Sequence, residues 1–273
     1  MFTLSAFADE IGPDPKEQVA VLKGCGVRHI EFRSILKTNV LDLTDLQITE
    51  FKALLDRHGF KLSAIGSPIG KVKIDAPFEP HLTRFKRAIE LCKVFGTPNI
   101  RVFSYYKPEG TTWEQWRGEI LSRMGEKVRR AEKAGVRLLH ENEHNIYGDD
   151  PKRVVDLLRS VNSPSFRAVY DAANYVFCGY DPWQGWQLTK SWTSHFHIKD
   201  WKAGDTRGSL AGEGQGRLPE VIADAVSGYD GFATLEPHLL GGGPTGGVTG
   251  TELFPKAVAA FTAILDRAGA TYR

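Results

Sequence analysis

Four polar side chains end apolar, β-rich runs in the second half of the chain, and their types could together bind a metal ion. Glu141 lies in LLHEN, Asp171 ends AVYD, His197 lies in HFHIKD, and Glu236 lies in ATLEP. This mainly hard-oxygen ligand set suits Mn²⁺, Mg²⁺ or Co²⁺ in six-coordination better than a four-coordinate structural zinc, although Zn²⁺ is also compatible. Two open positions would accept a carbonyl and an adjacent hydroxyl, with the metal as Lewis acid and template.

Taken alone, each residue could be an ordinary polar strand end, because acidic side chains often cap the helix that follows. Four of them in consecutive strands indicate a shared pocket. His195 shares a strand face with His197, and we prefer His197 as the ligand because it lies nearer the carboxyl end. His140 should face the helix layer, whereas His144, in the loop beyond, could reach a substrate.

Short β-rich runs alternate with amphipathic stretches along the chain, which is the pattern of repeated βα units. Eight strands are predicted, beginning at Phe2, Val27, Lys61, Asn99, Val136, Phe166, Ser194 and Gly231. The helical patterns include residues 44–58 and 80–95. Glycines follow several helices at the expected C-cap position, namely Gly26, Gly59, Gly96 and Gly135.

This pattern predicts a single (β/α)8 TIM barrel over residues 1–273, with the carboxyl ends of all strands on one face. A closed barrel is favoured over an open doubly wound sheet, and no GxGxxG motif follows the first strand. No interior linker divides the chain. The glycine-rich run from Gly241 to Gly247 follows the eighth strand, and we interpret it as a flexible edge of the active site.

Composition excludes several functional classes. The 35 basic and 33 acidic residues are spread along the chain, which argues against a nucleic-acid partner. No apolar run approaches a membrane span and no secretion signal is evident, so we expect a cytoplasmic protein. The three cysteines fit neither a disulfide framework nor a paired-cysteine zinc site.

Several further residues lie close to predicted strand ends. They would contact substrate hydroxyls or a phosphate, or serve as structural ion-pair partners: Arg101, Glu143, Lys199 and Asp200. Four tryptophans would stack on a sugar ring or pack in the helix layer: Trp113, Trp183, Trp186 and Trp201. Three acidic residues of the first two strands are interpreted as pocket-wall or helix-start residues: Asp9, Glu10 and Glu31.

In their order and strand placement, these motifs resemble the sugar phosphate isomerase/epimerase family of xylose-isomerase-like barrels. That family includes tagatose 3-epimerase-like enzymes, hydroxypyruvate isomerases and inosose dehydratases. The resemblance covers most of the chain, is strongest from Val136 to Pro237, and implies that the metal ligands are Glu141, Asp171, His197 and Glu236. The run GEGQGRLPE, with Glu213 and Arg217, resembles the family's glycine-rich substrate loop.

The resemblance also implies a reaction on a small sugar or sugar derivative. Glu141 and Glu236 would act as acid and base on opposite faces of a metal-stabilised enediolate, giving isomerisation or epimerisation. Tagatose-epimerase relatives have a histidine three residues after the strand-six aspartate. Asn174 stands there in this chain, so their ketose preference does not transfer, although Asn174 could bind a hydroxyl.

Three alternatives stay open. The first is a metal-dependent lyase or dehydratase acting on an inosose or 3-keto-glycoside, since an enediolate can also expel a β-leaving group. The second is a metal-dependent endonuclease, which would need more ligands and a basic surface. The third is a barrel that binds sugar without catalysis. Barrels of this kind often pair through top-face helices, which is compatible with a homodimer or homotetramer.

Overall fold

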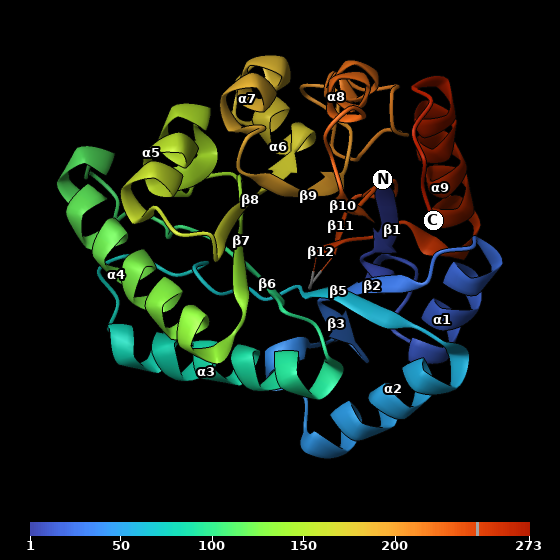
Figure 1. Ribbon diagram of the computed structural model, residues 1–273, viewed down its shortest axis with the longest axis horizontal. Helices are drawn as coiled ribbons and strands as arrows, with labels where there is room; N and C mark the ends of the chain where they lie inside the picture. The colour runs from blue at the N-terminus through green and yellow to red at the C-terminus, as the bar shows by residue number, and fades with distance from the viewer. Residues whose placement is uncertain (244–245) are drawn as a thin grey trace.

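The computed structural model describes residues 1–243 and 246–273, and its centre is a closed parallel barrel. The strands follow one another in the order β1-β10-β9-β8-β7-β6-β5-β2, with helices around them (Figure 1). Their bounds are β1 (Phe2–Ala6), β2 (His29–Phe32), β5 (Lys61–Ile65), β6 (Asn99–Val102), β7 (Arg137–Glu141), β8 (Phe166–Asp171), β9 (Thr193–Ile198) and β10 (Gly231–Leu235). The predicted (β/α)8 fold is confirmed.

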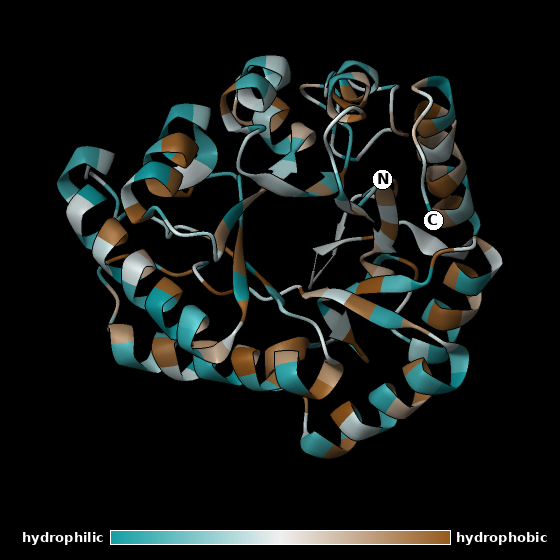
Figure 2. Cartoon of the chain, in the orientation of Figure 1, coloured by the Kyte–Doolittle hydropathy of each residue, from teal (hydrophilic) through white to brown (hydrophobic). Residues whose placement is uncertain are grey.

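Helices form the outer layer of the described residues. They are α1 (Pro15–Gly24), α2 (Asp45–His58), α3 (Phe78–Phe95), α4 (Trp113–Ala134), α5 (Pro151–Val161), α6 (Ala172–Phe177), α7 (Pro182–Thr189), α8 (Leu218–Ala225) and α9 (Gly250–Arg267). Brown and teal segments alternate along these helices in Figure 2, because one stripe of each helix packs on the barrel and the other faces water.

The ends of the elements follow local sequence signals. Thr44 and Gln47 form a capping box at the start of α2. The predicted glycine caps of α2, α3 and α4 are confirmed, with left-handed φ angles of 70°, 70° and 69°. The strand predicted to begin at Asn99 does begin there and ends at Val102, because the chain turns away into a loop in which Tyr105 has a φ of 70°.

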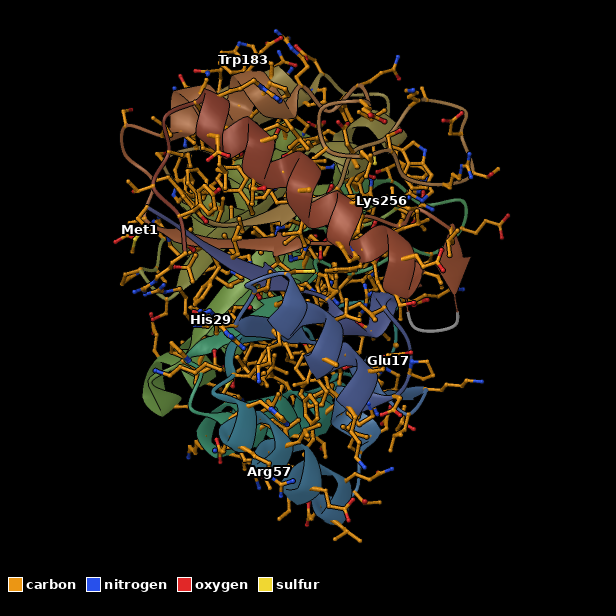
Figure 3. The ribbon with its side chains drawn as sticks, turned by 90° about the vertical axis from the view of Figure 1, so that its right-hand side faces the viewer. Met1, Glu17, His29, Arg57, Trp183 and Lys256 are labelled. Carbon is orange, nitrogen blue, oxygen red and sulfur yellow. The ribbon has the colours of Figure 1, made fainter. Side chains whose placement is uncertain are left out.

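The two chain ends meet on one side of the barrel (Figure 1). The amide of Phe2 donates to the Thr271 carbonyl at 2.9 Å, and the amide of Leu4 donates to that of Arg273 at 2.8 Å. Figure 3 shows α9 lying beside α1 on this side. Among the described residues, no helix combines the length and apolar character needed to cross a membrane.

Two short hairpins extend the carboxyl face of the barrel. One joins β3 (Ser34–Ile35) and β4 (Thr38–Asn39), and the other joins β11 (Gly242–Gly243) and β12 (Gly246–Gly247). The second hairpin falls in the glycine-rich run predicted to edge the active site. Two residues of that run, Pro244 and Thr245, lie outside the described residues.

Alternation along the strands divides the side chains between the barrel interior and the helix layer. On β9, Phe196 points outward and packs 5.3 Å from the Trp186 ring, whereas His195 and His197 point inward. Small apolar residues of three other strands form a separate interior cluster: Ala64, Leu139 and Val169. The inward positions of β9 therefore carry two histidines, of which His197 lies nearer the carboxyl end of the strand.

Candidate metal centre and active site

The structure brings together the four side chains that the strand-end pattern singled out. Glu141 and Asp171 are the last residues of β7 and β8, His197 is the last but one of β9, and Glu236 directly follows β10. One ligand atom from each lies within 4.8 Å of those from the other three, and all four residues are buried. The parallel topology places them at one end of the barrel.

Three ligand atoms of this cluster are buried and make no well-aligned hydrogen bond among the described residues, although each has a charged neighbour within 3.5 Å. They are His197 Nδ1, Asp171 Oδ2 and Glu236 Oε2. Three buried carboxylates that converge with so few aligned hydrogen bonds call for an explanation such as a bound cation. Three carboxylates and one imidazole nitrogen suit a hard divalent cation, so the residues fit a metal ion.

Cationic side chains surround the three carboxylates. Lys199 Nζ lies 2.7 Å from Asp171 Oδ2 and 3.5 Å from Glu236 Oε2. Arg33 Nη1 lies 2.7 Å from Glu236 Oε1, and Arg101 Nη1 lies 3.2 Å from Glu141 Oε2. These contacts offset the charge of the acidic cluster and fix the orientation of each carboxylate.

Burial and charge shift several pKa values in opposite directions. Burial raises the pKa of Asp171 to about 6, because the attraction of Lys199 offsets only part of the lost hydration. Burial also opposes the charged form of Glu236, but Lys199 and His197 outweigh it and hold the pKa of Glu236 well below its usual value. Nearby carboxylates, Glu141 foremost, raise the pKa of His197 against its own burial.

A cavity of about 520 Å³ opens above the cluster. Six of the predicted site residues line it: Arg101, Glu143, His144, Asn174, Lys199 and Glu236. Asn174 Nδ2 donates to Glu141 Oε1 at 3.2 Å, so this side chain touches both the cluster and the cavity. Glu143 pairs with Lys71 across the mouth at 2.8 Å, which makes it an ion-pair partner as well as a wall residue.

One wall of the cavity is aromatic. Phe177 and Trp201 both line it, and their ring centroids are 4.4 Å apart. Of the four tryptophans that the sequence offered for stacking, Trp201 is the one that lines this cavity. Trp186 packs in the helix layer, and the Trp113 ring packs edge-on against Tyr147.

Three of the predicted substrate contacts, Asp200, Glu213 and Arg217, do not line this cavity. Asp200 is buried and accepts the backbone N–H groups of Trp201, Gly212, Gly214 and Gly216, so it holds the loop after β9 together. Glu213 is exposed. Arg217 pairs with Glu220 and Asp181 on the surface. The glycines of this loop allow close packing around Asp200, since a Cβ at Gly214 would lie 2.2 Å from its Oδ1.

Two residues of the site were missed as functional candidates. Arg33 lies directly after β2 and contacts both Asp9 and Glu236, at 2.8 and 2.7 Å. His238 lies two residues beyond Glu236 and 3.4 Å from its Oε1. A signal for Arg33 was available in the sequence, where Glu31 and Arg33 alternate with apolar neighbours. Residues two apart along a strand share a face, so this alternation predicts that both charged side chains point into the barrel.

Comparison with known proteins places the chain in a family. The model of the xylose isomerase-like TIM barrel family matches residues 19–255. The chain belongs to this family. The resemblance found in the sequence motifs is therefore confirmed, and the family accounts for the closed barrel.

Two relatives of known sequence show how far the sequence similarity extends. The chain is 24% identical to a 3-dehydroshikimate dehydratase of Bacillus anthracis over 181 residues, covering 60% of this chain and 65% of that protein. It is 30% identical to a 2-epi-5-epi-valiolone 7-phosphate 2-epimerase of Actinoplanes sp. over 179 residues, covering 63% of each. Each match thus spans less than two thirds of the relative.

Among solved structures, a xylose isomerase-like TIM barrel protein of Mycobacterium smegmatis in complex with magnesium superposes with a TM-score of 0.75. The identity is 16%, and the match covers 98% of this chain and 97% of that one. At this identity the likeness concerns the fold.

Proposed function

We propose that the protein is a divalent-metal-dependent isomerase or epimerase of a sugar or sugar derivative. Glu141, Asp171, His197 and Glu236 would hold the ion, which would polarise a carbonyl and an adjacent hydroxyl of the substrate as a Lewis acid. One observation carries the proposal. Glu141 Oε1 and Glu236 Oε2 flank His197 Nδ1 at 3.1 and 3.4 Å, so two carboxylates face one point from different strands.

The two glutamates are the acid and base of this proposal. A carboxylate beside the substrate can remove the proton next to a carbonyl, and a carboxyl group on the opposite side can return a proton to the other face. Arg101 and Arg33 each fix the orientation of one glutamate. Lys199 adds positive charge where the substrate becomes more negative, and its burial strengthens that interaction.

The cavity suits a small polyhydroxylated substrate. Asn174, His144 and the Lys71–Glu143 pair offer hydrogen-bond donors and acceptors for hydroxyl groups. The face formed by Phe177 and Trp201 can pack against the C–H side of a ring. Both sequence relatives carry names of ring-compound enzymes, one a dehydratase and one an epimerase, which supports a cyclic or cyclising substrate.

Metal removal followed by a substrate screen tests the reaction. The protein would be treated with a chelator, reloaded with Mn²⁺, Mg²⁺ or Co²⁺, and incubated in D₂O with ketoses, inososes, hydroxypyruvate and keto-glycosides. We expect deuterium to enter the carbon next to the carbonyl without loss of a substituent. Appearance of an unsaturated ketone would point to elimination instead, and full turnover after chelation would refute metal dependence.

Two variants test the acid–base pair. Glu141→Gln and Glu236→Gln should each lower kcat by about 10²- to 10⁴-fold, because general acid–base catalysis contributes this much. Mn²⁺ binding is measured in parallel to separate chemistry from metal loss. Glu252→Gln, which changes an exposed glutamate on α9 outside the cavity, is the matched control and should keep full activity. Normal turnover by either site variant with metal bound contradicts the role.

A further inference from the structure

A fourth buried carboxylate lies behind the candidate metal centre. Glu31 on β2 has no exposed side-chain surface, and its Oε2 lies 3.2 Å from His197 Nε2. The same oxygen lies 3.0 Å from His195 Nε2 and accepts the Thr234 hydroxyl at 3.0 Å. Glu31 contacts the candidate ligand His197 from the side away from Glu141 and Glu236.

The two ring nitrogens of His197 therefore face different carboxylates. Nδ1 faces the oxygens of Glu141 and Glu236, and Nε2 faces Glu31. When Nε2–H donates to Glu31, the lone pair of the neutral ring is fixed at Nδ1, which is the atom aimed at the cluster. A carboxylate on the second nitrogen of a metal-binding histidine also orients the ring and raises its basicity.

Packing holds the imidazole in this orientation. The Phe7 ring meets the His197 ring edge-on, with centroids 5.0 Å apart and an interplanar angle of 79°. Arg101 Nε lies 3.9 Å from the other oxygen of Glu31, so the carboxylate has a cation beside it. Glu31 is thus fixed by neighbours from several strands and can act on His197 with little freedom of its own.

We propose that Glu31 is the positioning residue of the metal centre, which sets the Nε2–H tautomer of His197 and leaves Nδ1 free to bind the ion. This inference rests on the proposed metal site. Glu31 itself does not touch substrate or metal in this arrangement. It acts through His197, and His195 shares its oxygen one position deeper in the barrel.

Metal affinity is the first readout. The dissociation constant for Mn²⁺ would be measured by competition with a chromophoric chelator. Glu31→Leu should weaken binding by about 10- to 100-fold, the usual effect of losing such a partner. Glu31→Gln keeps an oxygen acceptor and should lose less, about 3- to 10-fold. If Glu31→Leu does not fold, Glu31→Gln provides the same test of metal affinity. Binding within twofold of the wild type by these variants refutes the role of Glu31.

The control is Thr234, whose side chain bonds Glu31 and which pairs with His197 through the strand backbone, a pairing that the substitution leaves in place. Thr234→Val removes a hydrogen bond to the same oxygen at nearly constant volume. It should change Mn²⁺ affinity by less than about threefold, because the second-nitrogen contact that governs ligand orientation is intact. An equal loss in Thr234→Val and Glu31→Leu would attribute the effect to general repacking of the interior and overturn the inference.

The tautomer is the second readout, and a merely structural role would not change it. Nitrogen-15 NMR of histidine-labelled, Mg²⁺-loaded protein should report His197 with no proton on Nδ1 and a hydrogen-bonded, slowly exchanging Nε2–H in the wild type, and a rapidly exchanging Nε2–H in Glu31→Leu. A wild-type protein that binds no Mn²⁺ would refute the metal centre, and this inference with it. A wild type that binds Mn²⁺ while the Glu31 variants bind equally well refutes this inference alone.

Discussion

Lys127 on α4 offers a quantitative test of how burial controls stability in this barrel. Its side chain is fully buried, and its Nζ, 4.4 Å from the Tyr105 ring centroid, has no hydrogen-bond partner in residues 1–243 and 246–273. The titratable groups that influence it are Arg123 on the same helix, His81 on α3 and His140 on β7. None of these is a carboxylate.

Burial lowers the pKa of Lys127 from 10.5 to about 7, and the charge of Arg123 adds to this shift. The unfolded chain keeps the proton up to its higher pKa, whereas the folded chain releases it above about 7. Stability contributed by this group therefore rises with pH between these values, by about 1.4 kcal/mol per pH unit. From pH 7.5 to pH 9 the rise is about 2 kcal/mol.

Lys127→Met removes the amine while keeping most of the volume. We expect this variant to be more stable than the wild type at pH 7.5, and to lack the additional rise of about 2 kcal/mol on going to pH 9. Urea unfolding followed by tryptophan fluorescence at both pH values gives the difference. Both His81 and His140 have pKa values lowered to about 3, so they titrate below this window.

The matched control is Lys133→Met, an exposed lysine on the same helix, which should follow the wild type at both pH values. The reasoning fails if wild type and Lys127→Met gain equal stability between pH 7.5 and 9. It fails equally if the variant is the less stable protein at pH 7.5, because Lys127 would then have a stabilising partner.

Two further variants test the loops around the site. Asp200→Ala removes the acceptor of four backbone N–H groups and should cost about 2–4 kcal/mol of stability, with faster proteolytic cleavage in residues 202–215; an unchanged cleavage rate would contradict this role. Gly247→Ala would place a Cβ 1.7 Å from His238 Cδ2 and push that ring away from Glu236. We expect kcat/KM to fall at least about tenfold with little change in Tm, and wild-type kinetics would show that the position of His238 does not matter.

Much of the architecture could be predicted because its signals are local. The alternation of β-rich and amphipathic runs gave all eight barrel strands, and helix caps such as Gly59 marked where the chain turns back. A parallel barrel then brings successive strand ends to one face, whatever the side chains between them. For this reason the convergence of Glu141 and Glu236 followed from strand order alone.

The contacts among these residues could not be predicted, because they join positions far apart in the chain. Glu31 meets His197 across 166 positions, and Arg33 meets Glu236 across 203. The sequence pattern can place such residues on the inward face of a strand. The stagger between neighbouring strands of the closed barrel then decides which inward side chains lie at the same height along the barrel axis and can touch.

Loops beyond the strand ends posed a different problem. Lys199 and Asp200 are neighbours in the sequence, yet Lys199 lines the cavity and Asp200 turns away to hold the glycine loop. The buried Lys127 is similar, since a lysine on an amphipathic helix is expected at the surface.

The sequence by itself determined the barrel and the strand ends that carry the candidate ligands. Tertiary packing decided their partners, because charge pairing and burial depend on distances between elements that no local pattern encodes.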